Sequence, residues 1–178
     1  MLWGGDSTRL TPLILEGLNL ISRNLDIRVI VGPFFDKQLK ATLIDSASAS
    51  KQSIQLIDAP ECLAGHMLWC DLAITTSGLI KYELAATSTP GILISIDDFH
   101  HHVNQPFAES GAVIDLGTNV SPQLIEYQVL ELLDSVDMRL GMAQAGRRLI
   151  DGRGAVRIIN EIIRPLAIQP EKQITHED

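Results

Sequence analysis

A short polar turn carries the side chains with the most evident chemistry. The segment 75–84 reads Thr-Thr-Ser-Gly-Leu-Ile-Lys-Tyr-Glu-Leu and joins an apolar run to a helical pattern. Because free backbone N–H groups at the start of a helix bind anions, Ser77 and Gly78 are predicted to hold a diphosphate. Lys81 follows closely enough to reach a phosphate, and Glu83 can accept hydrogen bonds from both ribose hydroxyls. The layout indicates a nucleotide or nucleotide-sugar site; the alternative is that Ser77 only caps the helix and Glu83 is solvated.

A second turn, near the start of the chain, can approach the same ligand. Gly4 and Gly5 let the backbone bend sharply and let a ligand come close, while Ser7 and Thr8 offer hydroxyl donors for a phosphate. The other interpretation is a tight turn in which Asp6 or Ser7 caps the following helix. The Gly-x-x-x-x-Gly-Lys pattern of phosphate-loop ATPases is absent, so an ATPase of that type is not expected.

Three adjacent histidines, His100, His101 and His102, follow two aspartates. Imidazole and carboxylate groups are common metal ligands, but neighbours in a loop seldom converge on one ion, and no further His or Cys completes a shell. We therefore predict no metal. One or two of these imidazoles can instead point into a crevice and bind a sugar or phosphate, with a solvated loop as the alternative.

The composition bounds the class of protein. The chain has 178 residues, 46% of them hydrophobic, which predicts one globular domain over 1–166 with a flexible polar tail over 167–178. A net charge of −8 argues against nucleic-acid or anionic-membrane partners. Two cysteines fit a reducing cytosol, and neither a membrane-spanning run nor a signal peptide is present, so we expect a soluble cytoplasmic protein.

Apolar, β-branched runs alternate with helical patterns along the chain. This order predicts a doubly wound, mostly parallel, Rossmann-like α/β sheet of about six strands, with helices on both faces and a helical C-terminal end. In such sheets ligands bind at the carboxyl ends of the strands. The arginines near the end are expected on a solvated, ion-paired helical face. The expected strands are 2–3, 27–31, 54–57, 72–74, 91–95 and 112–115, and the expected helices are 12–24, 36–48, 62–69, 79–87, 104–110, 122–133, 137–151 and 155–166.

Taken in order, these motifs resemble the C-terminal, nucleotide-sugar-binding domain of the two-domain GT-B superfamily. The resemblance is strongest to the branch with the UDP-sugar hydrolase of pseudaminic acid biosynthesis and the spore-coat polysaccharide protein, and weaker to the MurG glycosyltransferase. It covers nearly the whole chain. The matching pieces are Gly4-Gly5-Asp6, the run 70–74, Ser77-Gly78 through Glu83-Leu84, Pro90, Gly111 and the run 151–158.

The resemblance implies a UDP-sugar as substrate, without a cofactor or a required metal. It puts the loop 4–7 and Ser77-Gly78 near the phosphates, Glu83 at the ribose, and the turn after Ile57 at the base. Relatives often carry Asn-Gln or Gln-Gln after the following strand to touch the sugar. Here the spacing back from Gly111 puts His100 in that place, while Asn104 comes several residues later, so the sugar stays open.

The first residues, Met1-Leu2-Trp3, look like the end of a strand, so we expect the chain to be half of a larger protein. In this superfamily the N-terminal domain supplies the acceptor side of the cleft and, in the sugar hydrolase, the proposed catalytic base. The expected function is the donor half of a glycosyltransferase or UDP-sugar hydrolase in surface polysaccharide or nonulosonic acid biosynthesis. The alternative is a non-catalytic, truncated binding or scaffold module that pairs with a separate N-terminal half. An epimerase would need acidic and basic groups that the sequence does not locate.

Overall fold

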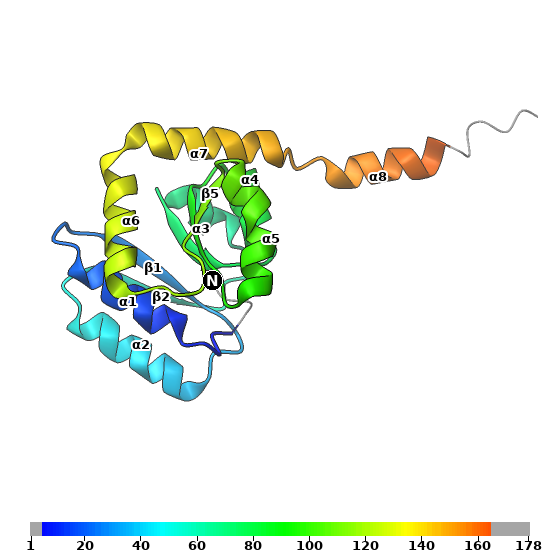
Figure 1. The fold of residues 1–178 in the computed structure, drawn as a ribbon. Helices are drawn as coiled ribbons and strands as arrows, with labels where there is room; N and C mark the ends of the chain where they lie inside the picture. The colour runs from blue at the N-terminus through cyan, green and yellow to red at the C-terminus, as the bar shows by residue number, and fades with distance from the viewer. Residues whose placement is uncertain (1–4, 165–178) are drawn as a thin grey trace, which may run out of the picture.

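The computed structural model describes residues 5–164, which form an α/β domain with parallel strands (Figure 1). Strands β1 (Asp26–Val31) and β2 (Ser53–Asp58) pair with each other. Strands β3 (Ala73–Thr76), β4 (Gly91–Ile94) and β5 (Val113–Asp115) pair in that order. The α/β class is thus confirmed. The predicted strand 2–3, the tail 167–178 and Gly4 lie outside the described residues.

The predicted single sheet of about six strands differs from the observed arrangement. Within residues 5–164 there are five strands, in one set of two and one set of three. Residues of β1 and of β3 line the same pocket, and within residues 5–164 no strand pairs with both of them. The other five predicted strands are present, with ends within one or two residues of the prediction.

Helices connect and cover the strands. They are α1 (Leu10–Leu20), α2 (Lys37–Ala49), α3 (Ala64–Trp69), α4 (Ile80–Ala86), α5 (Asp98–Glu109), α6 (Pro122–Asp134), α7 (Val136–Leu149) and α8 (Gly154–Ile163). The main error concerns α5, which was predicted to start at residue 104. It begins six residues earlier because the Asp97 carboxylate accepts the backbone N–H of His100 and caps the helix. The three histidines therefore lie in a helix and not in a loop.

The core is continuous between the strands and their helices. Ile92, Leu93 and Ile94 of β4 are fully buried, as expected for a central parallel strand covered on both faces. On one side α1 packs on α6, and Gly17 permits the close approach: a Cβ there would lie 2.7 Å from the carbonyl oxygen of Pro122. Backbone contact at this point fixes how the two helices cross.

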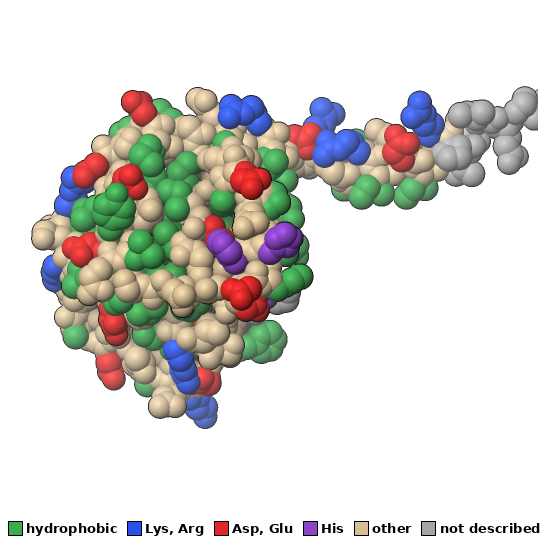
Figure 2. Space-filling model, viewed as in Figure 1, with side chains coloured by type: hydrophobic (Ala, Val, Ile, Leu, Met, Phe, Trp, Pro, Cys, Tyr) green, Lys and Arg blue, Asp and Glu red, His purple; other side chains and the backbone are tan. Residues whose placement is uncertain are grey.

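The last helix, α8, projects from the body of the domain (Figure 1). None of its residues is buried, and isoleucines such as Ile158 and Ile162 are more than half exposed. Figure 2 shows apolar side chains on one side of the projecting helix. The predicted ion pairing holds for two arginines: Arg157 contacts Asp151 at 2.6 Å and Arg164 contacts Glu161 at 3.7 Å. Arg147 instead donates to the backbone carbonyl of Ala86 at 3.1 Å.

Candidate functional site

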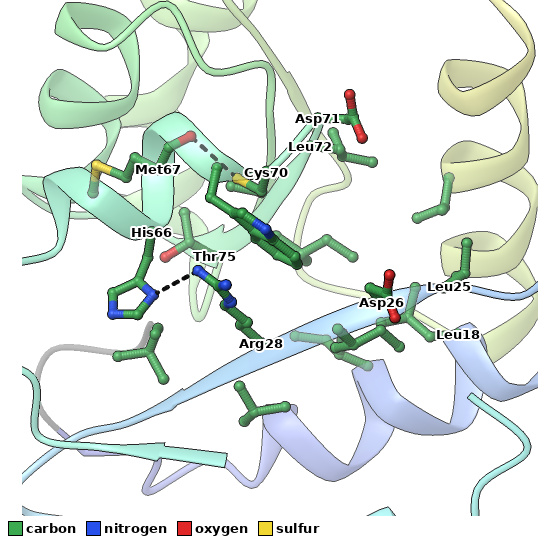
Figure 3. A pocket seen from close by; sticks show the side chains of 18 of the residues that line it. Leu18, Leu25, Asp26, Arg28, His66, Met67, Cys70, Asp71, Leu72 and Thr75 are labelled. Atoms are coloured by element: carbon green, nitrogen blue, oxygen red, sulfur yellow. Dashed lines mark hydrogen bonds between the residues drawn. The ribbon is translucent and has the colours of Figure 1, made fainter. Parts of the chain in front are cut away.

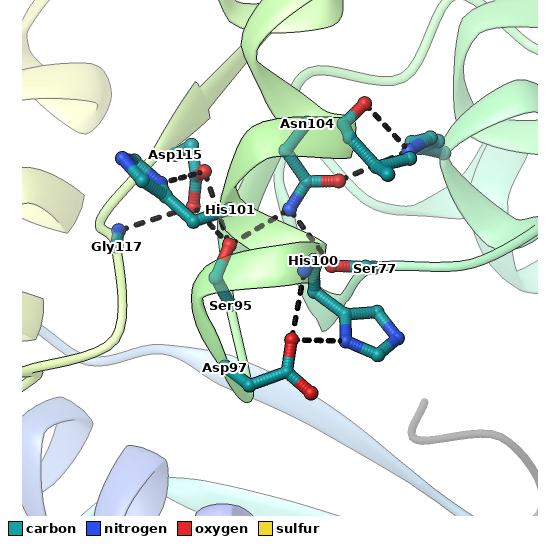
Figure 4. Close-up of polar contacts among 10 residues, drawn as sticks. Ser77, Ser95, Asp97, His100, His101, Asn104, Asp115 and Gly117 are labelled. Atoms are coloured by element: carbon teal, nitrogen blue, oxygen red, sulfur yellow. Dashed lines mark hydrogen bonds and ion pairs between the residues drawn. The ribbon is translucent and has the colours of Figure 1, made fainter.

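The carboxyl ends of β3, β4 and β5 bring a polar cluster together (Figure 4). Ser77 follows β3, Ser95 follows β4, and Asp115 ends β5. The first turns of α5 lie over the same edge and add His101 and Asn104. We call these five residues the edge cluster. Figure 2 shows histidine side chains on the face turned to the viewer, with acidic side chains beside them.

Asn104 is the centre of the edge cluster and has no exposed surface. Its Nδ2 donates to Oγ of Ser77 at 2.8 Å and to Oγ of Ser95 at 3.0 Å. Its Oδ1 accepts from Nζ of Lys81 at 3.0 Å. One amide therefore ties the ends of β3 and β4 to helices α4 and α5. Ser77 and Asn104 are buried, so within this cluster they position their neighbours.

Lys81, predicted to reach a phosphate, points inward in this structure. The residue is 1% exposed, and its Nζ also donates to the carbonyl of Val103 at 3.3 Å. The ammonium lies 5.3 Å from the ring centroid of Phe107, within the range of a cation–π contact. Desolvation lowers the pKa of Lys81, and the negative charge of Asp115 opposes this effect. Its geometry fits a residue that holds the edge cluster in place.

His101 and Asp115 form a pair that the sequence reasoning did not select. Nδ1 of His101 lies 2.8 Å from Oδ2 of Asp115, whose side chain is only 3% exposed. Asp115 also accepts from Oγ of Ser95 and from the N–H of Gly117. Because an ionised carboxylate only accepts, Nδ1 of His101 is the donor, and a neutral imidazole then carries its lone pair on Nε2. Because the ring is half exposed, Nε2 is accessible for a hydrogen bond.

The sequence does contain one indication of the His101–Asp115 pair, which is the position of Asp115. The residue ends a predicted strand at the edge where ligands bind, 14 residues after His101. His100, the histidine that was selected, instead contacts the cap of its own helix: its Nδ1 lies 2.7 Å from Oδ1 of Asp97. The backbone N–H of His100 is the main cause that lowers the pKa of Asp97, followed by the imidazole. His100 thus lies beside the edge cluster, on the cap of α5.

The loop before α1 lies beside the turn that follows β1. A Cβ on Gly5 would be 3.4 Å from Cβ of Phe34. The Asp6 carboxylate accepts the backbone N–H groups of Leu10 and Thr11, both at 2.8 Å, and is buried. Of the two interpretations of this turn, Asp6 thus follows the one in which it caps α1. Ser7 is exposed next to it, so a ligand can reach its hydroxyl.

Replacing Asp6 should weaken the start of α1. Asp6→Ala is expected to lower the free energy of unfolding by about 1 kcal/mol, because two helix N–H groups lose their acceptor. Asp6→Asn should keep most of the stability, since asparagine caps nearly as well. Urea unfolding of both variants, with the exposed Ser7→Ala as control, measures this. Equal stability of Asp6→Ala and the parent chain would contradict the capping role.

The turn after β3 leads into α4 without a side-chain cap, so the alternative in which Ser77 caps this helix is wrong. Gly78 has φ +130°, a conformation that favours glycine. Helix α4 begins at Ile80 with Leu79 as its N-cap, and no side-chain hydrogen bond caps it. Glu83 is exposed on α4, and no contact within residues 5–164 joins its side chain to the edge cluster. The proposed roles of Ser77, Gly78 and Glu83 toward a nucleotide stay predictions.

Large apolar side chains also lie exposed at this edge. Phe34 follows β1 and is 81% exposed, Leu79 follows β3 and is 75% exposed, and Phe99 follows β4 and is 70% exposed. Apolar groups so exposed at a ligand-binding edge suit contact with a flat ring or another protein surface.

Residues 5–164 contain no group of three or more His, Cys, Asp or Glu side chains placed to hold a metal ion. Among the same residues, no helix is both long and apolar enough to cross a membrane.

The fold and the edge cluster define a Rossmann-like α/β domain of the kind that binds ligands at its strand ends. No protein-family profile matches the chain. The spore coat polysaccharide biosynthesis protein SpsG of Bacillus subtilis (strain 168) is 30% identical over 110 residues, covering 61% of this chain and 32% of SpsG. In Histophilus somni (strain 129Pt), UDP-N-acetylglucosamine–N-acetylmuramyl-(pentapeptide) pyrophosphoryl-undecaprenol N-acetylglucosamine transferase is 24% identical over 160 residues, covering 86% of this chain and 44% of the transferase.

Among solved structures, MurG of Acinetobacter baumannii superposes with a TM-score of 0.74 at 20% identity, covering 92% of this chain and 48% of MurG. The chain is thus similar in sequence to part of each of the two curated relatives, and it has the fold of one α/β half of MurG. It spans less than half the length of either curated relative.

Proposed function

We propose that the chain binds a UDP-sugar at the carboxyl edge of its strands, as the donor half of a GT-B-like glycosyltransferase or UDP-sugar hydrolase. The observation that carries the proposal is the edge cluster, which assembles hydroxyl, amide and imidazole groups at one strand edge. The names of the two curated relatives support a role in surface polysaccharide synthesis and in the use of a UDP-linked sugar. Synthesis of a nonulosonic acid is the other pathway class that we propose.

Some of the residues contact the ligand, and others position these contacting residues. The backbone N–H groups of Gly78 and Leu79 and the hydroxyl of Ser7 donate to the diphosphate, and Glu83 accepts from the ribose hydroxyls, while the buried Ser77 holds the turn in place. His100 and His101 face the sugar side, where His101 is oriented by Asp115. Asn104 and Lys81 are buried and keep the loop after β3 in register with α5. The base lies against the turn after β2.

Titration calorimetry with UDP, ATP and GDP tests this proposal. We expect UDP to bind most tightly, and Glu83→Ala to weaken UDP binding roughly 10- to 100-fold, because hydrogen bonds to a charged group contribute about 1.5–3 kcal/mol. Glu109→Ala is the matched control: this carboxylate is also exposed but lies at the far end of α5. Absence of a UDP preference, or an unchanged affinity of Glu83→Ala, would reject the proposal.

The chemistry of a GT-B enzyme also needs groups from its other half. We propose that this half is an N-terminal domain or a separate subunit, since the curated relatives are more than twice as long as the matched part. Turnover assays on the chain alone and after addition of a co-purified partner separate an enzyme half from a non-catalytic binding module. A partner that restores transfer or hydrolysis supports the enzyme; a partner that leaves bound UDP-sugar intact supports the module.

A further inference from the structure

Lys81 is a buried cation that makes no ion pair with any residue in the range 5–164. Its two hydrogen-bond acceptors are neutral: they are Oδ1 of Asn104 at 3.0 Å and the carbonyl oxygen of Val103 at 3.3 Å. The ring centroids of Phe107 and Tyr82 lie 5.3 and 5.7 Å from the ammonium. Because an ammonium without water or a carboxylate partner is unfavourable in a protein interior, these contacts alone do not account for the charge.

The charged groups around Lys81 leave this positive charge without a close counter-charge. Asp115 of β5 is the acid that acts on it, and its charge raises the pKa of Lys81 against the larger, lowering effect of burial. However, the Asp115 carboxylate already accepts from Nδ1 of His101. On α7, which packs on α4, Arg147 brings a second positive charge to the far end of α4. The other acids on α4 and α5 are exposed: Glu83, Asp98 and Glu109.

Arg28 illustrates a cation in different surroundings. Its guanidinium lies 3.7 Å from the ring centroid of Trp69, and Nη1 lies 3.4 Å from Nδ1 of His66. These side chains line a pocket of about 630 Å³ (Figure 3), which is large enough for water to hydrate the guanidinium. Lys81 does not line this pocket. Its charge therefore depends on protein groups or on a bound ligand for stabilisation.

Asn104 connects the ammonium of Lys81 to the strand edge. Oδ1 of Asn104 accepts from Lys81, and Nδ2 donates to Oγ of Ser77 and of Ser95 (Figure 4). A cation at the oxygen of an amide polarises the amide and makes its N–H groups stronger donors. Ser77 precedes Gly78, in the turn where the diphosphate is proposed to bind. One side-chain amide thus separates the positive charge from that turn.

A buried charge acts strongly over such a separation. Salt and water screen exposed charges beyond about 10 Å, but they screen much less where both are excluded. The ammonium is enclosed by Asn104 and Phe107, so an anion at the turn after β3 is attracted without displacing either contact.

We propose that Lys81 is the counter-charge of the diphosphate at the carboxyl edge, acts on it through Asn104 and Ser77 without touching it, and thereby selects a nucleoside diphosphate over the uncharged nucleoside. Lys81 is thus a positioning residue with an electrostatic effect as well as a packing role. This inference rests on the proposed function for the place of the ligand. Because a bound anion favours the charged form of Lys81, the ligand and the proton on Lys81 bind cooperatively.

Calorimetry with UDP and with uridine, which lacks the diphosphate, tests the selection. Lys81→Met removes the charge, and Lys81→Gln also removes it but keeps a donor for Asn104. Both variants should bind UDP roughly 10- to 100-fold more weakly and uridine as the parent chain does. Lys51→Met removes an exposed lysine before β2, at the opposite edge, and should leave both affinities unchanged. Equal losses for UDP and uridine, or an unchanged affinity for UDP, would overturn the inference.

The pH profile separates the charge of Lys81 from its shape. The ratio of the UDP affinities of the parent chain and Lys81→Met should be largest at neutral pH, where Lys81 is charged. It should fall by up to about tenfold per pH unit as the pH rises through the pKa of Lys81, which burial holds below 10.5. Titration of UDP itself cancels in this ratio. A ratio above 1 that stays constant up to pH 10.5 would show an effect of shape alone and overturn the inference.

Pyrophosphate tests the role of Lys81 without the nucleoside and without a substitution. In the parent chain, saturation with pyrophosphate should raise the pKa of Lys81, followed by NMR of its Cε signal, by about one pH unit. A pKa that pyrophosphate leaves unchanged would overturn the inference, even where UDP binds. If pyrophosphate raises the pKa but UDP binds no better than ATP or GDP, the proposed function fails and the role of Lys81 stands.

Discussion

Asn104→Ala is expected to lower the free energy of unfolding by about 3–5 kcal/mol, because it removes the side-chain acceptor of a buried ammonium and leaves it with the longer bond to the Val103 carbonyl. Nζ of Lys81 donates to Oδ1 of Asn104 at 3.0 Å, and both residues are almost fully buried. The same substitution removes the donors to Ser77 and Ser95. Three polar groups then lose a partner in a place that water does not reach.

Chemical unfolding measures this loss against two reference variants. Gln105→Ala, at the exposed neighbour in α5, should change stability by no more than about 0.5 kcal/mol. Lys81→Met combined with Asn104→Ala should recover a large part of the loss, since the charge is gone and the methionine side chain suits an apolar site. If the double variant is as unstable as Asn104→Ala alone, the ammonium is not the source of the penalty.

The difference in stability between the parent chain and Lys81→Met should change with pH in one direction. The folded pKa of Lys81 lies below its ordinary value of 10.5, mainly because burial removes water from the ammonium. Between the folded pKa and 10.5 the unfolded chain binds more protons, so the parent chain gains stability relative to Lys81→Met as the pH rises through that window. A stability difference between these two chains that stays constant up to pH 10.5 would contradict the assignment.

Two glycine-to-alanine substitutions should have opposite effects. Gly17→Ala is expected to destabilise by about 1–3 kcal/mol, because the new Cβ would lie 2.7 Å from the Pro122 oxygen and 2.8 Å from Cβ of Ile125. Gly141→Ala, in α7, places a Cβ with nothing within 4 Å. It should stabilise by about 0.5–1 kcal/mol, since alanine favours helix more than glycine does.

Thermal unfolding of Gly17→Ala and Gly141→Ala tests whether α1 and α6 approach each other at Gly17 as closely as in the structure. Both substitutions add one methyl group within a helix, so helix propensity alone would raise both midpoints. A midpoint for Gly17→Ala above that of the parent chain would show that α1 and α6 are further apart than this contact requires.

The α/β class followed from the sequence because parallel strands are buried on both faces. Ile92, Leu93 and Ile94 are consecutive and fully buried, so an uninterrupted apolar run was a sound signal of a central strand. The start of α5 did not follow, because the capping role of Asp97 competes with a loop reading of the adjacent histidines. The local sequence pattern alone does not distinguish a helix capped by Asp97 from a loop that contains the histidines.

The candidate site was less accessible from the sequence, since it depends on contacts between distant residues. Lys81 was placed beside a phosphate because it follows a Ser-Gly turn, but helix phase directs its side chain to Asn104, 23 residues later. His101 and Asp115 belong to different elements whose meeting depends on how β4 and β5 pair. Sequence order gave the correct edge of the sheet, and tertiary packing selects which side chains face one another across it.

The direction of α8 depends on very few residues. Gly152, with φ +72°, lies in the short connection between α7 and α8, and no atom outside its neighbours would touch a Cβ there. A helix of ten residues is about 15 Å long, so a rotation of about 20° at this connection displaces its far end by about 5 Å. The connection between α7 and α8 is therefore a hinge. Small changes of backbone angle at Gly152 determine where the exposed isoleucines of α8 lie relative to the rest of the domain.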